Sequence, residues 1–266
     1  MAQASWRSVV CGLVVVLSVG VAAAQTPPVP TPTPTPDPVG TAVAAAGAKL
    51  LRYSTAEVRS TLDPLQGVKD TDARVGLSWG RLLEQEKKYD EALTQLRTAS
   101  ALAPASAEVQ IWIGEVLMRQ KKQGDADAAF QRAIDLMTPK VAADAAGTDY
   151  DSRYWLGLAQ QRRRLFDPAA AAFGKCLEIR PDDLMATYQL GLTRAFQGKW
   201  VDAVALLTKS LDRDSGIAYA YFYRALAEDK LGKKDLLVLD MQRFLTLAPN
   251  APEAERAQAV VNAARR

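Results

Sequence analysis

Acid–base and nucleophilic chemistry has few candidate residues in this 266-residue sequence, because it contains no histidine. Histidine supplies most general bases, the base of serine and cysteine triads, and the usual zinc ligands. Two carboxylate pairs remain, Asp182 with Asp183 and Asp212 with Asp214. They lie where helices are expected to end or begin, so helix capping explains them. We therefore expect no catalytic residue, no metal site and no cofactor.

The two cysteines do not indicate redox chemistry. Cys11 lies in an apolar N-terminal run that we expect to be removed, which leaves Cys176 as the only cysteine. An intramolecular disulfide is then excluded, even in an oxidising compartment. We interpret Cys176 as a small buried residue and not as a reactive thiol. Small residues hold the equivalent positions elsewhere in the chain, namely Ala99, Ala133 and Ser210.

Basic residues gather at regular intervals and form what we call the basic edge. Such a row could contact an anionic surface, such as phospholipid headgroups, acidic glycans or an acidic partner. The alternative is local, because Lys and Arg at the end of one helix and Asp at the start of the next complement the helix dipoles. The basic edge consists of Lys87, Lys88, Lys121, Lys122, Arg162, Arg163, Arg164, Lys199, Lys233 and Lys234.

The elements that carry these residues repeat with a period of 34 residues. Gly80 and Gly114 are 34 residues apart, as are Gly157 and Gly191, whereas Gly114 and Gly157 are separated by 43, which is one period plus nine residues. An alanine follows each glycine after 12 residues, and a large apolar residue after 16. A glycine in mid-helix costs about 1 kcal/mol relative to alanine, so we expect a second helix to pack closely against each one.

This period and residue order resemble the tetratricopeptide repeat, a helix, a short turn and a second helix. The resemblance implies an all-α, right-handed α-solenoid. Prolines 104, 139, 181 and 249 are expected to end the second helices, and residues 141–149 either lengthen a helix or form a loop. The expected parts are a degenerate N-terminal repeat or cap at 41–72, five repeats at 73–106, 107–140, 150–183, 184–217 and 218–251, and a C-terminal capping helix at 252–266.

The resemblance also implies that the first helices line a concave groove. Its floor should be aromatic and apolar from the third repeat onward, which suits an amphipathic helix or an extended apolar segment of a partner. The lysine and asparagine of the family's carboxylate clamp are absent from these positions, and the alternative is that the stripe only packs between repeats. The predicted groove residues are Ile111, Trp112, Tyr154, Trp155, Leu158, Tyr188, Leu192, Phe196, Tyr219, Phe222 and Tyr223.

The N-terminus has the pattern of an export signal. One basic residue, Arg7, precedes an apolar run from Val9 to Val21, and three alanines follow it, which predicts a signal peptide at 1–24 with cleavage before Gln25. The alternative is an uncleaved anchor, since the run is only slightly shorter than the roughly 20 residues of a membrane span. Residues 25–40 are rich in proline and threonine and favour polyproline II, so we interpret them as a stiff linker.

These features predict a non-catalytic scaffold that is exported to the periplasm or secreted. Removal of residues 1–24 lowers the net charge only from +3 to +2, so we expect no nucleic-acid partner. The family resemblance implies protein partners in an assembly of a bacterial-type cell envelope. Peripheral contact with a membrane or cell wall is a further expected interaction. Two alternative functions remain: a module that binds the membrane surface or anionic glycans through the basic edge, and a small helical ligand-binding protein or enzyme.

Overall fold

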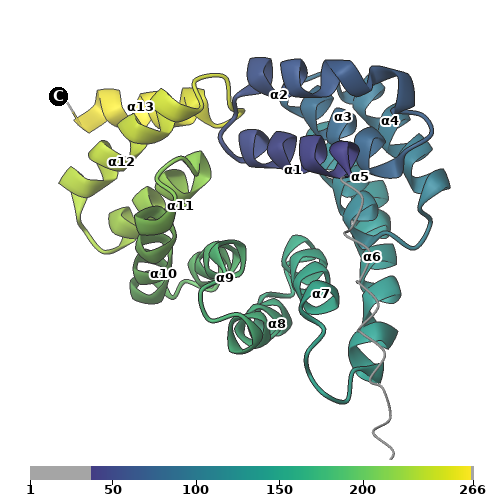
Figure 1. The fold of residues 1–266 in the computed structure, drawn as a ribbon. Helices are drawn as coiled ribbons and strands as arrows, with labels where there is room; N and C mark the ends of the chain where they lie inside the picture. The colour runs from purple at the N-terminus through teal and green to yellow at the C-terminus, as the bar shows by residue number, and fades with distance from the viewer. Residues whose placement is uncertain (1–36, 265–266) are drawn as a thin grey trace, which may run out of the picture. The chain divides into compact units, whose positions relative to one another are not determined.

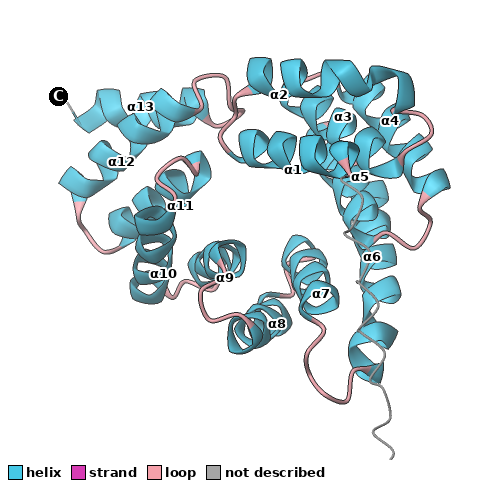
Figure 2. Ribbon diagram, viewed as in Figure 1, coloured by secondary structure: helices cyan, strands magenta, loops and turns pink. Residues whose placement is uncertain are grey.

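The computed structural model describes residues 37–264, and within this range every regular element is helical (Figures 1 and 2). The expected signal peptide and its cleavage site before Gln25 lie outside the described residues. Helices pack mainly against their neighbours in sequence, from α1 to α13, and this order confirms the expected all-α solenoid.

Five helix pairs follow the 34-residue period. Their first helices begin at Ala73, Ala107, Tyr150, Leu184 and Ala218, which are the residues at which the sequence places the five repeats. The pairs are α3 (Ala73–Gln85) with α4 (Tyr89–Leu102), α5 (Ala107–Arg119) with α6 (Gln123–Ala143), α7 (Tyr150–Arg162) with α8 (Phe166–Ile179), α9 (Leu184–Phe196) with α10 (Trp200–Arg213), and α11 (Ala218–Lys230) with α12 (Lys234–Leu247).

An N-terminal pair and a C-terminal helix flank the five pairs. Helices α1 (Pro38–Leu51) and α2 (Thr55–Leu62) are followed by the 3-10 helix η1 (Asp63–Val68), and α13 (Ala254–Ala264) packs on α12. Helix α1 begins earlier than the expected boundary at residue 41, because the Asp37 carboxylate accepts a hydrogen bond from the Gly40 N–H at 2.8 Å and Pro38 suits the first helical turn. The last residues assigned to the linker therefore belong to this helix.

Side-chain caps explain where the first helices α3, α5, α7 and α9 begin. The Asp149 carboxylate accepts from the Ser152 N–H at 3.0 Å, and the Asp183 carboxylate accepts from the Ala186 N–H at 2.7 Å. Asp72 and Ser106 cap α3 and α5 in the same way. Such caps satisfy amide groups that the helix itself leaves without a partner. Asp183, one of the candidate carboxylates, thus has a structural role.

The glycines of the first helices sit directly against large apolar side chains of the second helices. A Cβ atom added at Gly80 would lie 2.5 Å from Leu96 Cγ, and one at Gly191 would lie 3.0 Å from Leu207 Cγ. Gly114 faces Phe130 in the same manner. The glycine therefore makes room for the bulky residue that follows it by 16 positions. The alanine that follows the glycine by 12 positions is not its principal contact. Leu96, Phe130 and Leu207 are fully buried.

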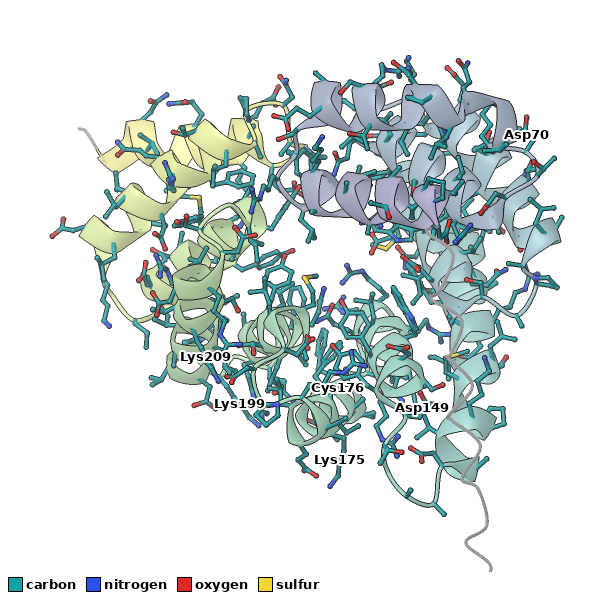
Figure 3. All side chains as sticks on the ribbon, viewed as in Figure 1. Asp70, Asp149, Lys175, Cys176, Lys199 and Lys209 are labelled. Carbon is teal, nitrogen blue, oxygen red and sulfur yellow. The ribbon has the colours of Figure 1, made fainter. Side chains whose placement is uncertain are left out.

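Cys176 lies on α8 (Figure 3). Its side chain is fully buried. Its Sγ lies 3.7 Å from the backbone oxygen of Tyr150. Burial raises the pKa of the Cys176 thiol to about 12, so the reactive thiolate is not populated at neutral pH. These surroundings agree with the interpretation of Cys176 as a small core residue.

The nine extra residues lengthen a helix and then form a loop. Helix α6 does not stop at Pro139 as predicted but continues through it to Ala143. Pro139 is exposed, so water can reach the carbonyl group that loses its amide partner. Met137 and Val141 pack on the core on both sides of the proline and hold the helix in place. The chain then returns to α7 through residues 144–149.

A left-handed residue recurs in the turn between the two helices of each pair. Its φ is +63° at Lys87, +61° at Lys121 and +77° at Gly232, and Arg164 and Gly198 hold the same position. Tyr53, 34 residues before Lys87, has a φ of +55°. The α1–α2 pair is therefore a sixth repeat in the same register. Residues with a side chain are disfavoured in this conformation by roughly 1–2 kcal/mol.

The substitution Lys121→Gly should stabilise the protein, because glycine adopts a positive φ without the steric cost of a Cβ atom. Part of the gain is offset by the greater freedom of glycine in the unfolded chain, so we expect the free energy of unfolding to rise by about 0.5–1 kcal/mol in urea titrations. The reverse change at the equivalent turn, Gly232→Ala, should lower it by a similar amount. A loss of stability in Lys121→Gly would contradict a strained turn at this position.

A buried pair of carboxylates lies between α11 and α12. Glu228 and Asp240 are both 4% exposed. Arg224 donates two hydrogen bonds to Asp240, at 2.7 and 2.8 Å, whereas Oε2 of Glu228 has no hydrogen-bond partner among the described residues. Burial, together with the charge of Asp240, raises the pKa of Glu228 to about 7. The Glu228 carboxyl group therefore stays protonated at pH values well above the ordinary pKa of a glutamate.

This pair should make stability pH-dependent. A glutamate titrates near pH 4.5 when unfolded but near 7 here, so its contribution falls as the pH rises through this interval. Glu228→Gln cannot ionise, so relative to the native protein it should gain about 2–3 kcal/mol of unfolding free energy between pH 5 and pH 8. Urea titrations at both pH values measure the difference. Glu255→Gln, at an exposed position on α13, is the control and should show no such gain. Equal gains in both variants would be inconsistent with a protonated Glu228.

Candidate functional site

The first helices share one surface, which we call the inner face: the side chains of α3, α5, α7, α9 and α11 that point away from the second helices. Successive first helices contact one another as well as their own partners. They therefore lie closer together than the second helices, which places them on the concave side of the stack. In Figure 1, α7, α9 and α11 lie inside the curve and α8, α10 and α12 outside it.

Arginines at the ends of two first helices reach back across the inner face. Arg119, the last residue of α5, places Nε 3.1 Å from Oε1 of Glu84 on α3. Arg162, the last residue of α7, pairs with Glu115 on α5 in the same direction. Burial raises the pKa of Glu84, and the positive charge of Arg119 opposes this rise. Partly buried pairs of this kind fix the relative position of the helices more than they add stability.

A third charged contact lies at the beginning of the face. Arg81 of α3 lies 3.7 Å from Glu108 of α5 and 4.5 Å from the ring centroid of Trp112. Burial lowers the pKa of Arg81 and raises that of Glu108, because each loses contact with water. The Nε atom of Arg81 has no hydrogen-bond partner among the described residues. The first half of the inner face is therefore charged.

The second half of the inner face is aromatic. Phe196, the last residue of α9, meets Tyr223 of α11 edge-to-face at 5.4 Å. Phe166, the first residue of the second helix α8, borders this face and stacks on Phe196 with ring centroids 5.4 Å apart. Tyr219 continues the row, 6.3 Å from Tyr223. Phe196 is 39% exposed, which is unusual for so large an apolar side chain in a close-packed protein. We call Phe166, Phe196 and Tyr223 the aromatic row.

The predicted groove residues fall into two groups. Six are buried and form part of the core in this structure, which corrects their assignment to an open surface: Ile111, Tyr154, Leu158, Tyr188, Leu192 and Phe222. They are buried because neighbouring helices and their own repeats cover them. The other five keep part of their surface in contact with solvent: Trp112, Trp155, Phe196, Tyr219 and Tyr223.

Of the charged residues of the inner face, only Arg162 was among the predicted site residues. Arg162 was assigned to the basic edge, but the structure places it on the inner face, opposite Glu115. A sequence signal did exist, because Arg119 and Arg162 occupy one position of the period, which continues as Phe196 and Lys230. The change from arginine to phenylalanine at this position marks the boundary between the charged and the aromatic halves.

The turns at the basic edge stack on one another. Gln120 donates to the Asp90 carboxylate at 2.8 Å, and Gln197 donates to the Asp167 carboxylate at 2.6 Å, so each turn contacts the start of the preceding second helix. Arg163 is not free, since it donates to the Gln131 side chain at 2.8 Å. Eight of the predicted residues are exposed: Lys87, Lys88, Lys121, Lys122, Arg164, Lys199, Lys233 and Lys234.

The dipole explanation holds for only part of the basic edge. Lys88, Lys122, Lys199 and Lys233 are the N-cap residues of the second helices and make no side-chain cap (Lys199, Figure 3). A positive charge at a helix N-terminus does not complement the dipole. Aspartates in the first turns of these helices do so instead. The edge thus carries alternating charges and not a uniformly positive surface.

Neither a metal cluster nor a membrane-spanning helix is found in residues 37–264. No group of three or more His, Cys, Asp or Glu side chains there could hold a metal ion. None of the described helices is long and apolar enough to cross a membrane. A surface hollow lined by Gln110, Arg132 and Asp135 gathers polar groups, yet it lies away from the inner face, beside α6.

Comparison with known proteins gives the family. The profile of the tetratricopeptide repeat matches residues 77–139 and 188–252, and a second profile of the same repeat matches 150–183, the third repeat of the sequence analysis. No curated protein sequence matches the chain.

Solved structures of other proteins resemble this chain to different degrees. TTC0263, a tetratricopeptide repeat protein of Thermus thermophilus, is 17% identical, with 71% of this chain and 99% of that chain covered at a TM-score of 0.53. YrrB, described as having an unusual peptide-binding site, is 17% identical, with 73% and 97% covered at 0.40. PilW, a type IV pilus biogenesis factor, is 18% identical, with 84% and 100% covered at 0.45.

Proteins of this kind bind protein partners and are generally non-catalytic. The matched profiles cover most of the described repeats, and the helix pairs recur with the period of the family. The chain therefore belongs to the tetratricopeptide repeat family and is a protein–protein interaction scaffold.

Proposed function

We propose that this chain is an exported, non-catalytic scaffold that binds an amphipathic or extended apolar segment of a partner protein on the inner face. The aromatic row carries the proposal. Phe196 is held at its centre by Phe166 and Tyr223, each 5.4 Å away, yet it keeps 39% of its surface exposed. A rigid, partly exposed ring loses little side-chain entropy on binding, and aromatic anchors contribute much of the energy of protein interfaces.

The charged half of the inner face would set the orientation of the partner. Its arginines already pair with Glu84, Glu108 and Glu115, so their charges are largely balanced before a partner arrives. A bound segment then gains little net affinity from them, but it must not place an unpaired charge against them. We expect the apolar residues of the partner at the aromatic row and its polar residues over α3 and α5.

Export and an envelope assembly are part of the proposal. The pattern of residues 1–24 supports export, and the Pro/Thr segment joins directly to α1, where it can separate the repeats from a membrane or wall. The envelope assembly follows from analogy with exported members of the family. The basic edge is not proposed as the main binding surface, because aspartates alternate with its lysines.

Photo-crosslinking in the native host tests the binding surface. A photoreactive phenylalanine at position 196 should form an adduct with one partner protein after irradiation. The same residue at position 239, which is 61% exposed on the outer helix α12, is the matched control and should form none. With the trapped partner purified, Phe196→Ala should weaken binding about tenfold or more, and Leu239→Ala less than twofold. Adducts at both positions, or at neither, would refute the aromatic row as the binding surface.

The N-terminus of the exported protein tests the localisation. We expect the chain recovered from outside the cytoplasmic membrane to begin at Gln25, as determined by N-terminal sequencing. Ala24→Glu places a charge next to the cleavage site and should leave residues 1–24 attached. An intact native chain that remains in the membrane fraction would favour the uncleaved anchor.

A further inference from the structure

The N-terminal helix pair contacts the last two full repeats of the described chain directly. Nη2 of Arg52, at the end of α1, lies 3.0 Å from Oδ2 of Asp214, which follows α10. The hydroxyl of Tyr53 lies 3.3 Å from that of Tyr219, and their ring centroids are 5.6 Å apart. More than 160 residues separate the members of each pair. In Figure 1 the turn between α1 and α2 accordingly lies beside the C-terminal helices.

Tyr53 occupies part of the inner face of α11. Its half-buried ring packs on the C-terminal apolar cluster that contains Phe222 and Phe244. Tyr219 also contacts Glu253, and Arg119 of the second full repeat lies 3.4 Å from the same carboxylate. Tyr53 therefore packs on an aromatic surface, while Asp214 pairs with the adjacent Arg52 and Glu253 contacts Tyr219.

The contact between the ends is much smaller than the contacts between neighbours. Contacting helix pairs within residues 37–264 join elements of the same or of neighbouring repeats, and none of the more extensive contacts joins α1 or α2 to α11, α12 or α13. The Arg52 side chain is 54% exposed, and ion pairs at such exposed sites contribute little to stability. In a solenoid, stability comes from each repeat and its nearest neighbours, so the ends can separate while the repeats stay folded.

We propose that Arg52 and Tyr53 form a latch that joins the two ends of the repeat array, and that a partner segment with a basic residue followed by an aromatic residue displaces it from α11. Arg52 and Tyr53 themselves indicate the residues that such a segment needs. Asp214 would pair with its basic side chain, and the rings of Tyr219 and Phe222 would pack against its aromatic side chain. The existence of the latch is independent of the proposed function, whereas its displacement by a partner rests on it.

Distances between spin labels test the latch in the chain from Gln25 to Arg266. Labels are attached at Ser60→Cys on α2 and Gln258→Cys on α13, both exposed, whereas the native Cys176 is buried and should not react. We expect one narrow distance distribution in the otherwise native chain. Tyr53→Asn should broaden it, because asparagine keeps the left-handed turn but removes the ring. Arg52→Glu should broaden it as well, and Arg52→Glu with Asp214→Arg should restore it.

Lys87→Asn is the matched control, since Lys87 holds the same left-handed turn position one repeat later and lies outside the latch. It should leave the distribution unchanged. Circular dichroism should show the same helix content in all variants. A distribution that stays narrow in both Tyr53→Asn and Arg52→Glu would overturn the latch, whatever the outcome of the crosslinking at position 196.

A peptide tests the chemistry of the displacing segment. The probe has the sequence of residues 49–56, and in the control peptide Glu and Ala replace its Arg and Tyr. The probe should bind the Tyr53→Asn variant at least tenfold more tightly than the native chain, because the native site is occupied by its own turn. Equal binding of both peptides to Tyr53→Asn, or no binding, would overturn the predicted specificity.

Discussion

Close contact between a glycine of the first helix and a large apolar side chain of the second determines the geometry of every full repeat except the last. Gly80 against Leu96, Gly114 against Phe130 and Gly191 against Leu207 bring the helix axes together, and a single Cβ atom would disturb each contact. These contacts lie on one side of the first helix. The side chains on its opposite side are therefore not needed for packing between the two helices of the repeat. That free side forms the inner face.

The inner face has two chemically different halves, and both follow from one position of the repeat. Where this position is arginine, as at Arg119 and Arg162, it reaches back to a glutamate on the preceding first helix. Where it becomes Phe196, the contact is a stack of rings. In the proposed function, the ion pairs would disfavour a wrongly charged partner, whereas the exposed ring would offer apolar surface to a matching one.

The ends of the array introduce a different kind of contact. Neighbouring repeats bury continuous apolar surface, but Arg52 and Tyr53 meet the last two repeats through one ion pair, one hydroxyl contact and one aromatic ring. Such a junction is weak enough to open without unfolding the repeats, and it lies on the same face that we propose for the partner. The contact between the two ends and the binding of a partner would thus compete for one surface. Partner binding would then shift the array towards the conformation in which its ends are apart.

The period of the sequence by itself determined the family, the all-α fold and the start of each first helix, because glycine positions, caps and turns act within 34 residues. Tertiary structure alone decided the rest. Pro139 lies inside α6 because apolar residues on both sides of it pack on the core, and Arg162 turns inward because Glu115 lies on the neighbouring helix. The contact between Tyr53 and Tyr219 depends on the small rotation of each repeat relative to the next, added up over the whole array. A sequence pattern within one repeat does not predict this total rotation.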